Sequence, residues 1–312
     1  MKLGPLFQPS NVYKESWYLF FYMKLLGLYP IRFHRSPYLN HICGIIILLP
    51  YYCLFSNVFH YTTRKMNLMM IITPATKIRQ LRFYTNVVML FVVVISTSRR
   101  CDKTRKAFEN LNSVDENMKF LNVYIDYNRC MRTDIVQITT VAFVTILFNL
   151  MDYYGLSDNN RNYMYVLMWI ADRTPDFVNT IVLCSFAVLT RKIQFRFRKI
   201  NELLDSINGG KNFISVIGSD VNNDFRLILS KVLLLKLWKT VSLVNMVYGI
   251  SLKVLTALYI LYLCLHICVV YNCSDYNQYL VDTFLSVLWG SLDIAKLVYI
   301  IHLYRILLIQ VA

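Results

Sequence analysis

The sequence predicts an all-α protein, a polytopic bundle of transmembrane helices, and two observations carry this prediction. The 312 residues are 56% hydrophobic and 16% charged, with a mean hydropathy of +0.44, whereas about a quarter of the residues in a typical soluble domain are charged. Residues 241–271 include a single charged side chain, Lys253, in thirty-one positions. A helix of this length is longer than the roughly 30 Å hydrocarbon core of a lipid bilayer requires.

Apolar stretches recur along the chain and predict six membrane spans within a single transmembrane domain over residues 1–312. The spans are expected near residues 38–60, 83–98, 136–154, 163–190, 241–271 and 280–304. The first thirty-seven residues carry five basic side chains and no apolar core followed by a cleavage site. We therefore expect no removable signal peptide, and the first span itself should direct insertion.

Shorter features before and between the first three spans predict a turn and an additional helix. Gly27, within the sequence KLLGLYP, predicts an apolar turn at the membrane surface. Pro50 is compatible with the first span because neighbouring helices can satisfy the carbonyl that it frees. Phe108, Leu111 and Val114 recur at a spacing of three in the segment between the second and third spans. This spacing predicts a cytosolic helix with one apolar face.

The fourth and fifth spans are expected to be long helices that project beyond the bilayer and pack together in the cytosol. Residues 191–240 contain ten Lys and Arg, which alternate with apolar residues at helical spacing until Gly209 and Gly210 interrupt the pattern. The apolar and basic sequence LILSKVLLLKLWKT then leads into span five. Span five contains no proline and only Gly249 weakens it, so the pattern favours one continuous helix.

The distribution of basic residues predicts an inside amino terminus. With this orientation the cytosolic segments hold twenty-four of the Lys and Arg, the outer loops hold six, and three lie in or near spans. Five of the six outer residues lie in the first outer loop, which goes against the rule. The formal net charge of +15 is thus explained by orientation in the bilayer, and no nucleic-acid partner is expected.

One sequence motif agrees with this orientation. Asn272-Cys273-Ser274 is the only N-x-[ST] sequon of the chain, and the predicted topology places it in the third outer loop. Asn272 is therefore a candidate glycosylation site, although such tripeptides are common by chance and this one lies close to the membrane.

Ionisable residues inside predicted spans are the best candidates for functional sites, because a charge in the bilayer is costly unless it is paired or faces water. We expect Lys253 to face the interior of the bundle. Asp293 and Lys296 are three residues apart on span six, share a helix face and could neutralise one another. Near the outer end of span four, mutual pairing is expected among Asp172, Arg173 and Asp176.

Aromatic side chains on span five provide further weak candidates for ligand contacts. The chain contains 23 Tyr and 19 Phe, so aromatic packing is the safer explanation for them. The candidates are Tyr248, Tyr259 and Tyr262.

Catalysis has little support in the sequence. The eight cysteines include no CxxC pair and no His-Cys spacing suited to zinc. No nucleophile–base arrangement or Walker loop is visible. We therefore expect no enzymatic activity, no metal and no cofactor.

Three short motifs resemble those of the insect gustatory receptor family, which belongs to the seven-transmembrane insect chemoreceptor superfamily. They are KLLGLYP before span one, RFRKINELL over Arg196–Leu204 and VNMVYGISL over Val244–Leu252. They lie at the family's relative positions, and the spacing of the spans fits along nearly the whole chain.

The resemblance implies a ligand-gated cation channel subunit that detects small-molecule tastants. It implies a homo- or hetero-tetramer with other gustatory receptor subunits, an extracellular-side pocket among the first six helices and a pore lined by the seventh. It also implies a multi-pass protein of the plasma membrane, in the dendrite, axon and cell body of gustatory neurons.

The family's signature on its seventh helix is Thr-Tyr, five mostly apolar residues, and Gln-Phe. Here Leu303-Tyr304 and Gln310-Val311 reproduce the spacing from Tyr to Gln but lack the Thr and the Phe, and Arg305 interrupts the apolar run. The count of spans places this stretch at the end of the sixth. We interpret the match as accidental and expect the chain to be truncated before its pore helix, as a fragment, an isoform or a degenerate copy.

Four alternatives compete with a taste channel. An odorant receptor of the same superfamily has the same helix pattern. A truncated receptor without its pore helix would bind but not conduct. A G-protein-coupled receptor requires an outside amino terminus, which the basic residues oppose, and an acidic-Arg-Tyr triplet after span three, where this chain reads GLSDNN. A secondary transporter should show internal repeats and broken helices in both halves, and we find no repeat.

Overall fold

The computed structural model describes residues 9–29, 46, 48–59, 74–155, 163–209, 220–273 and 280–311. All regular secondary structure within these residues is helical, which confirms the all-α prediction. The helices are α1 (Val12–Glu15), α2 (Trp17–Leu25), α4 (Pro74–Arg99), α5 (Cys101–Phe120), α6 (Tyr127–Gly155), α7 (Tyr163–Gly209), α8 (Asp220–Cys273) and α9 (Leu280–Val311), with a further apolar helix over Leu48–Phe59.

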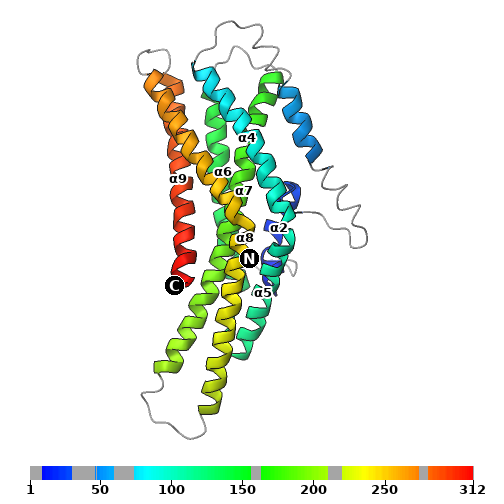
Figure 1. Cartoon of the computed structure of the whole chain (residues 1–312), viewed down its shortest axis with the longest axis vertical. Helices are drawn as coiled ribbons and strands as arrows, with labels where there is room; N and C mark the ends of the chain where they lie inside the picture. Colours follow the sequence, from blue (N-terminus) through cyan, green and yellow to red (C-terminus); the bar gives the residue numbers. More distant parts are fainter. Residues whose placement is uncertain are drawn as a thin grey trace, which may run out of the picture.

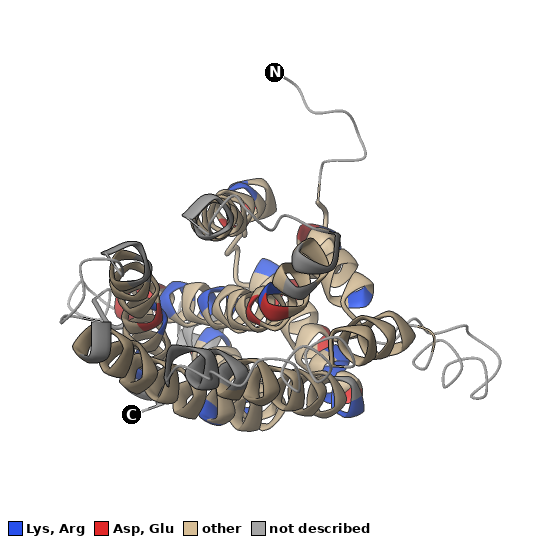
Figure 2. Cartoon of the chain, turned by 90° about the horizontal axis from the view of Figure 1, so that it is seen from above, with Lys and Arg blue, Asp and Glu red and all other residues tan. Residues whose placement is uncertain are grey.

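The helices form one elongated bundle in which the long elements run side by side (Figure 1). α8 packs against α9, α7, α5 and α4, whereas α6 packs against α7 and α9. Viewed from above, acidic and basic positions occur on helices in the middle of the bundle as well as on those at its edge (Figure 2). The core of this bundle contains paired charges in addition to apolar side chains, among them Arg196 with Asp115 and Lys296 with Asp176.

Three helices are long and apolar enough to cross a bilayer, which indicates a membrane protein. They are the segments Tyr127–Met151 of α6, Asp224–Tyr271 of α8 and Ser286–Leu307 of α9. Leu48–Phe59 and Phe83–Thr97 are apolar but shorter. In α7 the charged residues Asp172, Arg173 and Asp176 divide the apolar sequence into two parts, and this helix is not one of the three candidate spans. The finding supports three of the six expected spans by length and composition.

The two longest helices confirm that the segments predicted as the fourth and fifth spans form long helices that pack together. α7 has 47 residues and α8 has 54, which correspond to roughly 70 Å and 80 Å, more than twice the hydrocarbon thickness of a bilayer. They pack together and extend past the carboxyl end of α9 (Figure 1). α8 is continuous through Gly249, and α7 ends at Gly209, as the sequence predicted.

α7 also continues through a proline that the sequence pattern did not identify as important. Pro175 lies inside the helix, where it cannot donate to the carbonyl four residues earlier. The preceding Thr174 hydroxyl donates to the carbonyl of Ile170 at 2.7 Å. This side-chain bond provides local hydrogen bonding where the proline interrupts the regular ladder.

Two short connections have the backbone geometry expected at helix ends. Gly27 has φ of 72°, and the amide of Leu28 donates to the carbonyl of Met23 at 2.8 Å, a Schellman arrangement that terminates α2. This confirms the predicted turn. Asn122, with φ of 58°, ends α5 in the same way through the amide of Val123, which donates to Met118 at 3.0 Å.

α5 confirms the helix predicted between the second and third spans. Phe108, Leu111 and Val114 are all buried, at 1% exposure or less, as the spacing of three required. The Phe108 ring lies 4.7 Å from that of Phe20 and 5.9 Å from that of Tyr13. The amino-terminal helices α1 and α2 therefore pack against the apolar face of α5.

Candidate functional site

A buried ion pair joins α7 to α9 inside the apolar part of the bundle. Nζ of Lys296 donates to Oδ1 of Asp176 at 2.6 Å, and both residues are 8% exposed. Charges removed from water need a close opposite charge to offset the lost solvation. The pair thus fixes one height of α9 against α7.

Polar groups of α7, α8 and α9 lie around this pair. The Tyr259 ring lies 5.2 Å from Nζ of Lys296, and its buried hydroxyl makes no hydrogen bond within the part of the chain that the structure describes. Oδ1 of Asn179, one turn from Asp176, is likewise buried without a hydrogen bond there. Nε2 of His266 lies 3.7 Å from Oδ2 of Asp293. We call these six residues, Asp176, Asn179, Tyr259, His266, Asp293 and Lys296, the interhelical polar cluster.

The expectation that Asp293 and Lys296 neutralise one another is wrong. Both are buried on the same side of α9, at 2% and 8% exposure, but Lys296 pairs with Asp176 and Asp293 lies against His266. Neighbouring helices bring these partners to the buried face of α9. The spacing within one helix correctly placed the two residues on a common face and gave the wrong partners.

The acidic and basic residues of α7 are only partly paired with one another. Nε of Arg173 lies 3.7 Å from Oδ2 of Asp172, which agrees with the predicted mutual pairing. The guanidinium of Arg173 also lies 4.2 Å above the Trp289 ring of α9. Asp176 pairs with Lys296 of α9.

The three tyrosines predicted on span five are all buried. The Tyr248 ring lies 5.7 Å from that of Phe186, in the aromatic packing that the sequence offered as an alternative. Tyr262 donates a hydrogen bond to Oδ1 of Asn86 on α4. Among the three, Tyr259 alone belongs to the interhelical polar cluster.

Lys253 does not face the interior, and this expectation is wrong. Its side chain is exposed on α8, on the same face as the exposed Met246, Ile250 and Ile260. The neighbouring Leu252, which is fully buried, takes the inward position because successive residues point about 100° apart around a helix. The candidate glycosylation residue Asn272 lies in the last turn of α8, and its side chain and Ser274 lie outside the described residues.

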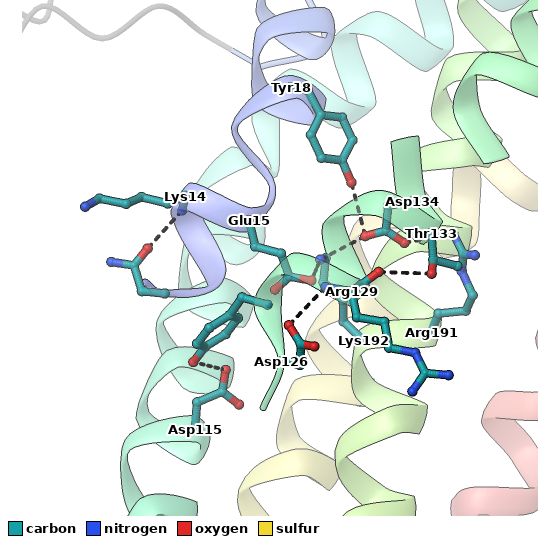
Figure 3. Close-up of polar contacts among 12 residues, drawn as sticks. Lys14, Glu15, Tyr18, Asp115, Asp126, Arg129, Thr133, Asp134, Arg191 and Lys192 are labelled. Atoms are coloured by element: carbon teal, nitrogen blue, oxygen red, sulfur yellow. Dashed lines mark hydrogen bonds and ion pairs between the residues drawn. The ribbon is translucent and has the colours of Figure 1, made fainter. Parts of the chain in front are cut away.

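A second set of charges joins the amino-terminal helices to α6 and α7 (Figure 3). Lys192 pairs with Glu15 of α1 and with Oδ2 of Asp134, the latter at 3.0 Å. Arg191 reaches Oδ1 of Asp134 at 3.0 Å, and the Tyr18 hydroxyl donates to Oδ2 of Asp134 at 3.1 Å. We call these five residues the amino-terminal ion network.

One turn further along α7, Arg196 forms a separate buried pair. Its Nε and Nη2 donate to the two oxygens of Asp115, each at 2.6 Å, and Nη1 donates to the carbonyl of Lys192 at 2.8 Å. The Tyr127 hydroxyl donates to Oδ2 of Asp115 at 2.9 Å. This bidentate geometry is the strongest form of an Arg–carboxylate contact, and it fastens α5 to α7.

Burial changes the acidity of the groups in the amino-terminal ion network. Glu15 is fully buried, which raises the pKa of its carboxyl, while the charge of Lys192 opposes the shift. Burial and the negative charge of Asp134 raise the pKa of Tyr18, so its hydroxyl stays protonated and donates. Oε2 of Glu15 is buried without a hydrogen bond among the described residues, which fits a carboxylate whose charged form is incompletely compensated.

The amino-terminal ion network was missed at the sequence level. Glu15 and Lys192 are 177 positions apart, and Arg196 and Asp115 are 81 apart. No motif or periodicity connects such residues. The alternation of cationic and apolar residues after span four predicted a long helix. It indicated neither the burial of Lys192 and Arg196 nor the carboxylates that face them.

Comparison with known proteins finds no family model that matches the chain and no curated protein similar to it. The arrangement of the site therefore carries the functional argument. It offers buried charged and aromatic side chains between membrane-compatible helices, an environment suited to binding and conformational coupling.

Proposed function

We propose that this protein is a chemoreceptor of the insect gustatory type, a subunit of a ligand-gated cation channel that responds to small-molecule tastants. The observation that carries the proposal is the interhelical polar cluster. Its Asp176–Lys296 pair lies between α7 and α9, and ionisable residues within membrane helices are retained mainly where they serve binding, transport or gating.

The cluster has groups that a ligand could engage. The Tyr259 hydroxyl and Oδ1 of Asn179 are buried without hydrogen bonds among the described residues. Leaving such groups unpaired costs roughly 1–3 kcal/mol each, and a ligand with complementary donors and acceptors would recover that cost. Small polar molecules with an apolar body, such as alkaloids and sugars, fit this combination of groups.

The exposure of Lys253 supports an oligomer. A cation in the middle of the apolar part of α8 is costly against lipid, and the surrounding exposed residues are apolar. Contact with another subunit, or with water enclosed by the assembly, would remove this cost. We propose a homo- or hetero-tetramer in the plasma membrane of gustatory neurons, with the six predicted spans and an inside amino terminus.

Orientation provides the decisive test, because the rival G-protein-coupled receptor has its amino terminus outside. An epitope tag at the amino terminus, stained in intact and in permeabilised cells, should be reached only after permeabilisation. A carboxyl-terminal tag on α9 serves as the second reference point. Staining of the amino-terminal tag in intact cells would overturn the channel proposal.

Function is then tested by cation currents in cells that express the chain alone or with other receptor subunits. Caffeine, denatonium, sucrose and fructose are the probes. Asp176→Asn and Lys296→Met should each abolish a response or shift its half-maximal concentration by about tenfold or more, the range expected for a buried charged hydrogen bond. The matched control Arg105→Gln alters an exposed pair with Glu109 and should leave the response unchanged.

A further inference from the structure

An open cavity of about 490 Å³ lies between the start of α6 and the middle of α7. Its volume is within the range of roughly 300–1,000 Å³ that is typical of small-molecule sites. It lies beside the amino-terminal ion network, and Asp134, Arg191 and Lys192 line it as well. The cavity is distinct from the interhelical polar cluster, none of whose residues contributes to it.

The lining is strongly cationic. Five of the lining side chains are Lys or Arg, whereas two are carboxylates. Arg191 and Lys192 already pair with Asp134 and Glu15, so the charges of these four residues offset one another. The remaining lining charges are three cations, Arg129, Arg198 and Lys199, against one carboxylate, Asp126.

These three cations are available to a ligand. The guanidinium of Arg129 has no ion-pair partner within the described ranges, and Figure 3 shows it on the opposite side of Lys192 from Glu15. Arg198 and Lys199 pair with Glu202, at 3.8 Å and 2.7 Å, and lie 5.5 Å and 6.0 Å from the Phe195 ring. The side chain of Glu202 is 53% exposed, and water and salt weaken exposed pairs of this kind. An anion with more than one charge would compete successfully for these cations.

The cavity also lies where the apolar sequences of α6 and α7 give way to charged residues. The apolar runs of α6 and α7 begin at Ile135 and end at Thr190, respectively, and the lining residues immediately adjoin both limits. The exposed Tyr124 and the partly exposed Phe195 give the opening an aromatic border, which is typical of the interfacial zone. In the proposed orientation this is the cytosolic surface of the bilayer.

We propose that this cavity binds a phosphomonoester-bearing anion at the cytosolic membrane surface, with Arg129, Arg198 and Lys199 as its ligands. Guanidinium groups match phosphate oxygens in a bidentate geometry, and basic pockets between helices on the cytosolic side accept inositol phospholipid headgroups. The same chemistry would accept a soluble inositol phosphate. The inference rests on the orientation in the proposed function, because that orientation exposes the cavity to the cytosol.

The full chain, reconstituted in nanodiscs of phosphatidylcholine, allows a direct test. Binding of fluorescein-labelled inositol trisphosphate is measured by anisotropy. In parallel, the unfolding midpoint is measured in nanodiscs with phosphatidylinositol bisphosphate and in nanodiscs with phosphatidylserine at equal total charge. We expect probe binding, a raised midpoint with the bisphosphate lipid, or both, and no comparable rise with phosphatidylserine.

The two arms distinguish the source of the phosphate. If the bisphosphate lipid raises the unfolding midpoint and also prevents binding of the soluble probe, the ligand is the lipid headgroup. Probe binding that the lipid does not displace identifies a soluble inositol phosphate. Absence of probe binding together with equal midpoints in all nanodiscs would overturn the proposal.

A pair of double variants separates a specific site from general attraction to positive charge. Arg129→Gln with Arg198→Gln removes two exposed cations of the cavity and leaves the ion network intact. Arg105→Gln with Lys106→Gln removes two exposed cations of α5 that do not line the cavity. The first should weaken binding about tenfold or more, and the second should have little effect. Equal effects of the two double variants would refute a defined site.

The outcome is separable from that of the proposed function. Reconstituted protein binds the probe or fails to bind it whichever way the amino terminus points in cells. A cytosolic amino terminus with tastant responses but no phosphate binding would remove only this inference. An outside amino terminus would overturn the proposed function even if the purified protein bound the probe.

Discussion

Arg196 is among the largest side chains that are fully buried in the described bundle, and Asp115 is the carboxylate that pairs with it directly. Removal of one partner of a buried pair leaves an uncompensated charge and typically costs about 3–5 kcal/mol. Replacement of both partners by apolar side chains of similar volume is often neutral or stabilising. Loss of one partner should therefore destabilise the protein, whereas replacement of both partners should not.

Asp115→Leu is therefore expected to lower the free energy of unfolding by about 3–5 kcal/mol, whereas the double variant Asp115→Leu with Arg196→Met should recover most of that loss. Denaturant unfolding in detergent measures both. Arg105→Gln, which alters an exposed pair, is the control and should cost about 0–1 kcal/mol. A double variant that is no more stable than Asp115→Leu alone would contradict the explanation.

Glu15 gives the amino-terminal helix a specific pH dependence. Its pKa is raised in the folded protein because burial disfavours the charged form. The contribution of Glu15 to the free energy of unfolding is therefore fully present below the pKa of this carboxyl in the unfolded chain, about 4.5. It is lost as the pH rises through the higher pKa of the folded state. Acidification from neutral pH should therefore stabilise the packing of α1 on the bundle through protonation of Glu15.

Glu15→Gln should remove that dependence. The unfolding midpoints of the natural chain and of this variant are measured across the acidic range. As the pH falls, the midpoint of the natural chain is expected to rise relative to that of the variant. A control with Glu109→Gln, an exposed carboxyl on α5, corrects for general charge effects. A natural chain that loses stability relative to Glu15→Gln on acidification would show that Lys192 outweighs the burial of Glu15.

At the scale of elements, the contact between α8 and α9 depends on a small residue. A Cβ built on Gly290 would lie 3.6 Å from Cβ of His266 and 3.9 Å from Cδ1 of Leu263, which is ordinary van der Waals contact. A methyl group therefore fits between the helices, and a larger side chain would separate them. The separation would also displace Asp293 and Lys296 from their partners in the interhelical polar cluster.

Gly290→Ala should consequently be neutral or stabilising by up to about 1 kcal/mol, because alanine favours the helix. Gly290→Leu should lower the unfolding midpoint and reduce tastant responses. Ser291→Leu, at an adjacent exposed position, is the matched control and should have little effect on either. Equal behaviour of the two leucine variants in unfolding and response measurements would contradict close packing at Gly290.

Elements were more predictable from the sequence than contacts. The continuity of α8, the end of α7 at Gly209 and the buried face of α5 follow from local periodicity and from glycine, which act over a few residues. The partners of Lys296, Asp293 and Lys192 depend on which helices become neighbours, and a single sequence does not encode that in any local pattern. For the same reason Lys253 could be placed on a helix, but not on its outward face.

At the scale of the whole molecule, the bundle is apolar on its outside as well as its inside. Val136, Phe143 and Ile146 on α6 are each more than half exposed, as are many apolar residues of α8 and α9. Water would be a poor solvent for such a surface, and exposed apolar patches of this extent mark contact with lipid or protein. The three candidate spans therefore predict an integral association with membranes.

That association is testable by extraction of membranes from cells that express the tagged chain. Alkaline carbonate and high salt should leave the protein in the pellet, and detergent should release it, because apolar burial in lipid is insensitive to salt and charge. A peripheral protein in the same lysate serves as the control for complete stripping. Release of the tagged chain by carbonate would contradict the spans of α6, α8 and α9.

The length of α7 has a mechanical consequence. Asp176 and Lys192 are sixteen residues apart on this one helix, so a roughly 24 Å lever connects the interhelical polar cluster to the amino-terminal ion network. A tilt of about 5° about Asp176 would carry Lys192 roughly 2 Å sideways. The Lys192–Asp134 distance is 3.0 Å, so a displacement of that size would either break the contact or pull α6 and α1 along with α7. A spectroscopic label on α1 would then report movements of α7 near Asp176, in the interhelical polar cluster.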